Sequence, residues 1–419
     1  MPNKLLTPTQ VLREALRVLH NNLVFLKNVN KQYSQEFAIS GAKVGSTVNV
    51  RLPNRYYVVK STALAAQNTN ETTVPVTLTT NYQVGLNFTQ AELTLSLDDF
   101  SKRILTPAMA RLASQMDQDG LGQCVNIFQQ VGTPGNTPGT SGGSASGLLQ
   151  YNAPLVYLNA GMMMDNMACP RDENRRVVIN PIAMADTVNS FTTFFHEGEA
   201  ISAQYKKGVM GSALGFEFAM DQNVNLLLTG THAGSSGAVV NGAGQTGSIL
   251  STTGWTASST GILNPGEIFT IAGVSSVNPE NQTSTGQLAQ FVVAGVCSSD
   301  AFGNVSIPIY PAIVVAGPQV ANGTVTASPA ANAALTLLSG SANTSYPMNI
   351  AYHQDAFTLA TADLEMPRGV DFAARETYEG VSMLMVRAYD INNAQFPCRI
   401  DVLGGWATLR PELACRITG

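Results

Sequence analysis

The stretch that decides the fold is LDDFSKRILTPAMARLASQMDQDGLGQCVNIFQQV, which runs from Leu97 to Val131. Its apolar residues recur mostly at spacings of three and four, which predicts one long helix from Asp98 to Val131. Thr106 followed by Pro107 is typical of a helix start, because threonine caps free N–H groups and proline has no N–H to leave unpaired. The pattern therefore predicts a break near the beginning of this helix.

Two glycines, Gly120 and Gly122, lie inside the predicted helix. Each weakens a helix by up to about 1 kcal/mol relative to alanine. Most of the stability of a helix in a protein comes from packing, so other elements must keep this one straight. We expect the remainder of the chain to be arranged along it.

The composition limits the classes of function. Only 12% of the 419 residues are charged, where about 25% is usual, and the net charge is −5. No lysine or arginine occurs between Lys207 and Arg368, which excludes a basic nucleic-acid groove in the middle third. A surface this poor in charge must consist of uncharged polar residues or be covered by partners.

The cysteines indicate neither a disulfide framework nor a zinc site. They are scattered and odd in number, they form no CxxC pair, and no histidine lies at ligand spacing from them. We expect reduced thiols in a cytoplasmic protein. The N-terminus lacks the apolar run of a signal peptide, and no 18 consecutive apolar residues predict a membrane span.

The segments before the long helix predict an arm and a projecting loop. Thr7 and Pro8 begin an amphipathic helix whose stripe includes Leu12 and Leu19, more typical of a docking arm than of a membrane anchor. Strand-like runs then flank the polar sequence AAQNTNETT. They extend over Thr47 to Arg51, Arg55 to Lys60, Thr73 to Thr79 and Gln83 to Phe88. A long hairpin is marginal alone, so we expect it to lie on a neighbouring subunit.

The segments after the long helix mix helices and strands. Ala153 to Met167 has helical character, and a strand from Val177 to Asn180 leads into a helix from Ile182 to about Phe195. Gly208 to Val224 predicts a turn that leads into a strand from Phe216 to Met220. A nucleotide site there is disfavoured because the strand follows the glycines.

The composition changes sharply over residues 226–345. Glu267, Glu280 and Asp300 are the only charged residues there, and short β-like runs recur between turn signals. This pattern predicts an inserted small barrel or sandwich, because α+β character resumes after it.

No set of residues indicates catalysis, so we predict no catalytic, cofactor-binding or metal-binding residue and no enzyme. The match to G-x-S-x-G over Gly139 to Gly143 lacks the flanking strand and helix of a nucleophile elbow. Asp98 and Asp99 are better explained by the positive end of the helix dipole. His353 and Asp355 share one face of a strand and are expected to be a surface pair.

The order of these parts resembles the α+β major capsid protein fold of tailed bacteriophages, in particular coat proteins with an inserted all-β domain. The segments that carry the resemblance are GVMGSALGFEFAMDQNV, GEIFTIAGVSSVNP, AYHQDAFTLATADLEMPRGVD and the ending LRPELACRI. The resemblance implies an N-terminal arm, an extended β loop, a peripheral domain built on the long helix as its spine, and an axial domain. The implied division is arm 1–40, loop 41–90, peripheral domain 91–175 with 395–419, axial domain 176–225 with 346–394, and inserted domain 226–345.

The resemblance also implies a function and partners. The protein would self-assemble as hexamers and pentamers into an icosahedral shell around double-stranded DNA, without sequence-specific DNA binding. A scaffolding protein would assist assembly in the bacterial cytoplasm, a portal would occupy one vertex, and Gly120 and Gly122 would absorb bending during maturation. Two alternatives are a cargo-loading shell of the same fold and a glycan-binding surface protein. In the latter, Trp255, Phe269, Phe291 and Tyr310 would line the site, although such residues are more often core.

Overall fold

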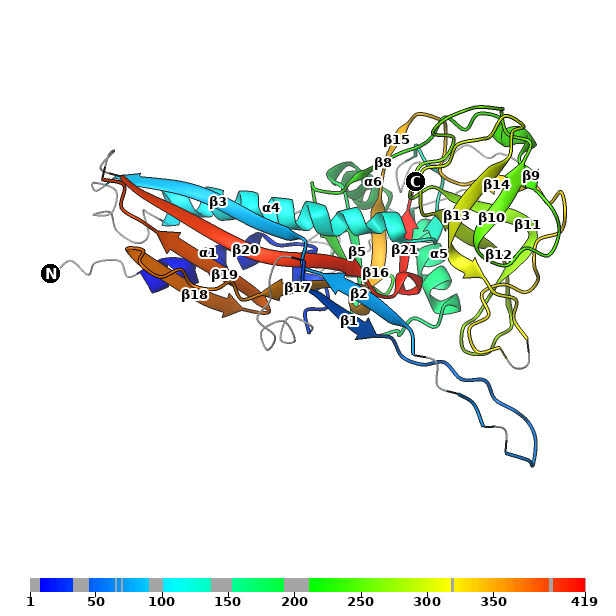
Figure 1. The fold of residues 1–419 in the computed structure, drawn as a ribbon, viewed down its shortest axis with the longest axis horizontal. Coiled ribbons are helices and arrows are strands. Elements are labelled where there is room, and N and C mark those ends of the chain that lie inside the picture. Colours follow the sequence, from blue (N-terminus) through cyan, green and yellow to red (C-terminus); the bar gives the residue numbers. More distant parts are fainter. Residues whose placement is uncertain are drawn as a thin grey trace. The chain divides into compact units, whose positions relative to one another are not determined.

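The computed structural model describes residues 8–32, 45–64, 66–68, 71–89, 101–136, 153–191, 211–317, 320–391 and 395–418. The chain divides into two compact units. Unit 1 comprises residues 1–52, 72–121 and 357–409, and unit 2 comprises residues 53–71, 122–356 and 410–419. Both mix helices with sheets (Figure 1), which is the predicted α+β class.

Unit 1 is built on a five-stranded sheet. The central strand β20 pairs with β3 along one edge and with β19 and β17 along the other (Figure 1). Helix α1 packs against β18 and β19 and buries the predicted stripe. The helices of unit 1 are α1 (Pro8–Asn22), the 3₁₀ turn η1 (Leu26–Asn28), the π-helical turn η3 (Ser101–Leu105) and α4 (Thr106–Gly122). Its strands are β1 (Thr47–Arg51), β2 (Thr73–Thr77), β3 (Thr80–Thr89), β17 (Phe357–Ala362), β18 (Phe372–Tyr378), β19 (Val381–Arg387) and β20 (Gln395–Thr408).

The predicted long helix is present, but its end is not where the pattern placed it. A π-helical turn leads directly into α4 at Thr106, so the predicted break is a change of helix type. Asp98 and Asp99 lie outside the described residues. The prediction was wrong beyond Asn126, where the 3₁₀ turn η4 (Gln123–Asn126) ends, because the chain then forms the short strand β4 (Gln130–Val131).

The strand β4 belongs to a six-stranded mixed sheet in unit 2, with the order β4-β21-β16-β5-β7-β6. The pairs β4–β21 and β5–β7 are parallel, and the others are antiparallel. Helix α5 packs against β21 and β4. The helical elements are α5 (Ala153–Asn166), α6 (Pro181–Phe191), η7 (Gln354–Ala356) and η8 (Pro411–Leu413). The strands are β5 (Arg175–Ile179), β6 (Ser212–Ala213), β7 (Phe216–Met220), β16 (Asn349–His353) and β21 (Ala414–Ile417), with β8 (Leu226–Leu228) and β15 (Ser345–Pro347) paired separately.

The turn predicted before β7 is confirmed. Leu214 and Gly215 connect β6 to β7 with φ angles of 52° and 80°. Positive φ at both central residues gives the turn that matches the twist of a hairpin, and glycine adopts it without strain.

Residues 238–337 form a closed antiparallel barrel. The sheet order is β14-β11-β12-β13-β10-β9, and Val239 forms a bridge with Ala334, next to β14, which joins the two edges. Its core contains Phe269 and Phe291, both fully buried. The barrel strands are β9 (Val239–Val240), β10 (Gly247–Thr253), β11 (Ile268–Val277), β12 (Ser284–Val293), β13 (Val305–Ile313) and β14 (Leu335–Leu337).

Candidate assembly surfaces

Large apolar side chains are exposed along residues 53–64. Val58 is 86% exposed, Leu64 is 94% exposed, and Tyr56 is 59% exposed. This part of the chain forms neither helix nor strand, so the predicted strand from Arg55 to Lys60 is wrong. A single exposed apolar side chain needs no explanation. Several large apolar side chains exposed on one loop indicate a surface that other molecules cover.

The loop nevertheless has an internal support. The side chain of Gln67 accepts a hydrogen bond from the N–H of Tyr57 at 3.0 Å and donates one to its carbonyl at 2.5 Å. The amide thus takes the place of a partner strand. Where the loop leaves the β1–β2 strand pair, the N–H of Leu52 donates to the carbonyl of Thr72 at 2.9 Å, next to the last pair of that ladder. The loop is therefore held in an extended form without burying its apolar residues.

The loop also carries positive charge. Arg55 lies 3.2 Å from Glu412, whose carboxylate also accepts from Arg410 at 3.3 Å. Arg51 and Lys60 are exposed. A half-exposed ion pair such as Arg55–Glu412 contributes little to stability, about 0–1 kcal/mol. The pair joins the beginning of the loop to η8.

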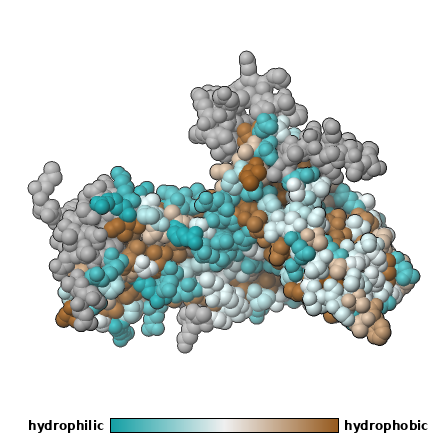
Figure 2. Space-filling view, turned by 90° about the horizontal axis from the view of Figure 1, so that it is seen from above, coloured by the Kyte–Doolittle hydropathy of each residue, from teal (hydrophilic) through white to brown (hydrophobic). Residues whose placement is uncertain are grey.

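A second group of exposed apolar residues lies in unit 2. Leu226 and Leu228 are on one face of β8 and are 63% and 55% exposed, and Leu158 on α5 is 50% exposed. Figure 2 shows apolar patches among polar residues on the face in view.

The predicted spine helix is anchored by a carboxylate that the sequence analysis did not single out. Asp117 is 1% exposed and accepts hydrogen bonds from the N–H groups of Val24 and Leu26, both at 2.8 Å. A charged acceptor makes strong hydrogen bonds to backbone N–H groups. Asp117 therefore holds the segment after α1 against α4.

Close packing gives Gly120 a role that the sequence pattern did not indicate. A Cβ atom at this position would lie 2.6 Å from the ring of Trp406 and 2.9 Å from Phe25. A side chain there would push these rings away. The expectation that Gly120 and Gly122 absorb bending remains a prediction.

The C-terminal strand is fixed by a fully buried arginine. Arg416 donates to the carbonyls of Ile127 at 2.5 and 3.1 Å, Gly266 at 2.6 Å and Val125 at 3.4 Å. Burial lowers its pKa to about 10, so it stays charged at neutral pH. One side chain thus ties the end of the chain to the residues after α4 and to the start of β11.

His353 and Asp355 form the predicted pair, with Nδ1 of His353 3.7 Å from Oδ2 of Asp355, but His353 is buried rather than at the surface. His353 is 3% exposed, and its Nε2 lies 3.2 Å from both carboxylate oxygens of Asp172. Its Nδ1 accepts from the N–H of Asp355 at 3.2 Å, so Nε2 carries the proton and donates to Asp172. The surface position of His353 was predicted wrongly because its further partner, Asp172, comes from a loop distant in sequence. Both ring nitrogens of His353 thus make contacts within the chain.

The aromatic residues of the proposed glycan site do not form a surface. Trp255 is 5% exposed, Phe269 and Phe291 are fully buried, and only Tyr310 is substantially exposed. The indole N–H of Trp255 donates to Thr252 at 2.8 Å inside the barrel. These residues are core, which removes the observation that favoured the glycan-binding alternative.

A second buried carboxylate, Glu267, lies directly before β11. It is fully buried, accepts from the N–H groups of Asn264 at 2.6 Å and Gly230 at 3.1 Å, and pairs with His232. Glu267 is one of three charged residues in the 120 residues from 226 to 345, but the sequence does not show that Glu267 is buried.

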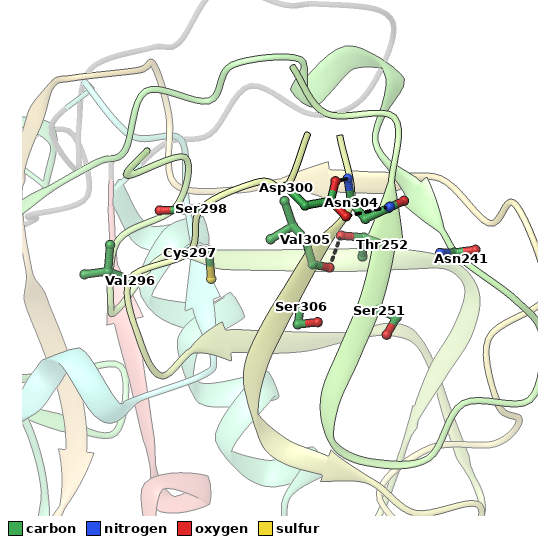
Figure 3. Close-up of a pocket in the computed structure, with 10 residues that line it drawn as sticks. All are labelled: Asn241, Ser251, Thr252, Val296, Cys297, Ser298, Asp300, Asn304, Val305 and Ser306. Carbon is green, nitrogen blue, oxygen red and sulfur yellow. Dashed lines mark hydrogen bonds between the residues drawn. The ribbon is translucent and has the colours of Figure 1, made fainter. Parts of the chain in front are cut away.

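A recess of about 440 Å³ lies on the barrel (Figure 3). Its lining is mainly hydroxyl and amide groups, including Ser251, Ser306 and Asn304. Asp300 lies at the rim of the recess. Hydrogen bonds from the backbone N–H and the side-chain amide of Asn304, and from other backbone N–H groups, lower the pKa of this carboxylate.

Within the described parts of the chain, no helix is long and apolar enough to cross a membrane. No three histidine, cysteine, aspartate or glutamate residues there are grouped closely enough to hold a metal ion. The five cysteines are buried and free.

Comparison with known proteins identifies the family. The family described as "P22 coat protein - gene protein 5" matches residues 3–419. No curated protein matches the chain.

Three solved structures illustrate the similarity. A structure from Mycobacterium phage Che8 is 10% identical, with 94% of this chain and 90% of that one covered and a TM-score of 0.42. The capsid structure of cyanophage P-SCSP1u is 9% identical, with coverage of 90% and 84% and a TM-score of 0.40. The CUS-3 coat protein I-domain is 27% identical, with coverage of 24% of this chain and 94% of that one and a TM-score of 0.19.

Coat proteins form shells from copies of themselves, and the family match extends over nearly the whole length. The chain belongs to the P22 coat protein family, and it is a structural major capsid protein of a tailed phage with the corresponding α+β capsid fold.

Proposed function

We propose that this coat protein assembles as hexamers and pentamers into an icosahedral shell that encloses packaged double-stranded DNA. Its membership of a coat protein family supports the shell. The low content of charged residues, 12%, suits a protein whose surfaces are covered by copies of itself.

Within the shell, each part of the chain has a proposed role. Residues 1–40 form the N-terminal arm, 91–175 with 395–419 the peripheral domain, and 176–225 with 346–394 the axial domain at the capsomer centre. Residues 226–345 form the inserted domain. Residues 41–90 form the extended loop that overlaps a neighbouring subunit.

The exposure of Val58 and Leu64 is the observation that carries the proposed overlap. Residues 86% and 94% exposed on an extended loop gain hydrophobic free energy when another surface covers them. Full burial of one such side chain contributes about 1.5–3 kcal/mol. The lysine and arginine residues of the same loop would steer it towards an acidic neighbouring surface.

The proposed partners follow from charge and from the family. A scaffolding protein would assist assembly in the host cytoplasm, and a portal would occupy one vertex. The net charge of −5, with no lysine or arginine from residue 208 to 367, suits a container that encloses DNA without binding its sequence. We propose no enzymatic activity.

The test replaces the apolar loop residues in the full chain. A Val58→Asp, Leu64→Asp double variant, produced with scaffolding protein, should remain unassembled, because carboxylates on a covered surface must be desolvated. Electron microscopy and sedimentation would measure the fraction of shells. Thr62→Asp is the matched control, since it adds charge to an exposed polar position of the same loop. It should assemble normally.

Circular dichroism spectra and melting curves of both variants should match the wild type. Normal shells from the double variant would contradict the overlap. Failure of the Thr62→Asp control as well would show that added charge alone prevents assembly, which also removes the support for apolar contact.

A further inference from the structure

The loop that follows β7 begins with a buried carboxylate that lacks part of its expected hydrogen bonding. Asp221 is 4% exposed, and its Oδ1 accepts from the N–H and the Nδ2 of Asn223, both at 2.8 Å. Its Oδ2 is buried and has no hydrogen-bond partner within the described part of the chain. A buried charged oxygen without a donor is costly. This environment favours a small species from solution that compensates the charge.

The sequence around Asp221 has the spacing of oxygen ligands in a cation-binding loop. Asp221, Asn223 and Asn225 alternate along the chain, as do the first three ligands of calcium loops with the pattern D-x-[DN]-x-[DN]. Asn223 and Asn225 are half-buried, so an ion has a path from solvent. The loop is not an EF-hand, because Leu226 and His232 occupy the positions of the required glycine and bidentate glutamate.

Asp221 also lies at a place in the fold where proteins with parallel strands commonly bind ligands. Strands β5 and β7 are parallel and end together, with Ile179 opposite Met220. The N–H of Asp221 donates to the carbonyl of Ile179 at 3.0 Å. Asp221 therefore lies at the carboxyl edge of a parallel pair, where α/β sheets place their ligands.

The same loop leads into the segment that contains the barrel. β8 begins at Leu226 and pairs with β15, and the carbonyl of Asn225 accepts from the N–H of Met348 at 2.9 Å. The chain thus enters and leaves this segment side by side. An ion bound at Asp221 would fix the entering strand relative to β7.

We propose that Asp221, Asn223 and Asn225 form a Ca²⁺ site at the carboxyl edge of β7. The orphaned Oδ2 of Asp221 supplies the charged ligand, and the asparagines supply amide oxygens. Ca²⁺ accepts such irregular oxygen sets, whereas Mg²⁺ requires near-ideal octahedral geometry and loses its waters reluctantly. With one carboxylate, the Kd is expected to be about 1 mM, at the weak end of protein calcium sites.

The test is equilibrium dialysis of radioactive Ca²⁺ against the purified full-length monomer after removal of bound metal by a chelator. The wild type should bind one ion with a Kd of about 1 mM, and Asp221→Asn should bind at least about tenfold more weakly. Asp300→Asn is the matched control. Asp300 also accepts backbone N–H groups in a turn, at 2.8 Å, but it is exposed, so its replacement should leave binding unchanged.

A gain-of-affinity variant keeps the proposal falsifiable if Asp221→Asn folds poorly. Asn223→Asp adds a second carboxylate to the loop and should tighten binding by about tenfold, because ligand charge sets the affinity of calcium loops. The proposal is overturned if the wild type binds no Ca²⁺, if Asp221→Asn binds as the wild type does, or if Asn223→Asp changes nothing. The assay uses monomers, so its result is independent of whether shells form.

Discussion

The barrel and the loop at residues 53–64 differ in the burial of their apolar side chains. In the barrel, Phe269 and Phe291 are fully buried because the sheet closes on itself through the Val239–Ala334 bridge. In the loop, Val58 and Leu64 are almost fully exposed, because no strand of the described chain pairs with this segment. The difference separates a part that completes its own core from a part that, as we propose, a neighbouring subunit covers.

The largest expected effect tests the barrel. Phe291→Ala should lower the free energy of unfolding of the barrel by about 3–5 kcal/mol, because it leaves a cavity in a closed core. Denaturant unfolding followed by Trp255 fluorescence, in a Trp406→Phe background, would report on the barrel. Phe302→Ala, at a position 85% exposed, is the control and should change stability by less than about 0.5 kcal/mol. Equal losses would contradict the assignment of Phe291 to the core.

An intermediate effect tests how the barrel is attached to the rest of unit 2. Arg416→Met should cost about 2–4 kcal/mol, since it leaves the carbonyls of Ile127 and Gly266 without donors in a buried site. The loss is partly offset because a buried charge disappears as well. Urea unfolding of the monomer would measure it. A variant as stable as the wild type would show that these carbonyls find other partners.

The sequence predicted the elements with strong periodicity or turn chemistry. Helix α1, the α4 start at Thr106, the strand β7 and the β-rich character of the barrel segment follow from patterns within one stretch of chain. The end of α4 did not, because residues after Asn126 pair with β21, nearly 290 positions away. His353 was misassigned for the same reason, since its partner Asp172 is remote in sequence.

The interior charges were the least predictable part of the molecule. Buried Glu267 accepts from the N–H of Gly230, which is remote in sequence, whereas exposed Asp300 accepts from N–H groups of its own turn. The alternation of Asp221, Asn223 and Asn225 was visible in the sequence. It acquires meaning only with the buried and unpartnered Oδ2 of Asp221.

The smallest expected effect on the monomer completes the comparison. Val58→Ala and Leu64→Ala should each change the free energy of unfolding by less than about 0.5 kcal/mol, because side chains 86% and 94% exposed lose almost no burial. Urea unfolding of the monomer would measure this. The same variants should weaken assembly, since truncation removes apolar area that becomes buried only between subunits. If the loop variants lowered the stability of the monomer as much as Phe291→Ala does, the loop side chains would be packed within their own chain. The contrast with the barrel would then disappear.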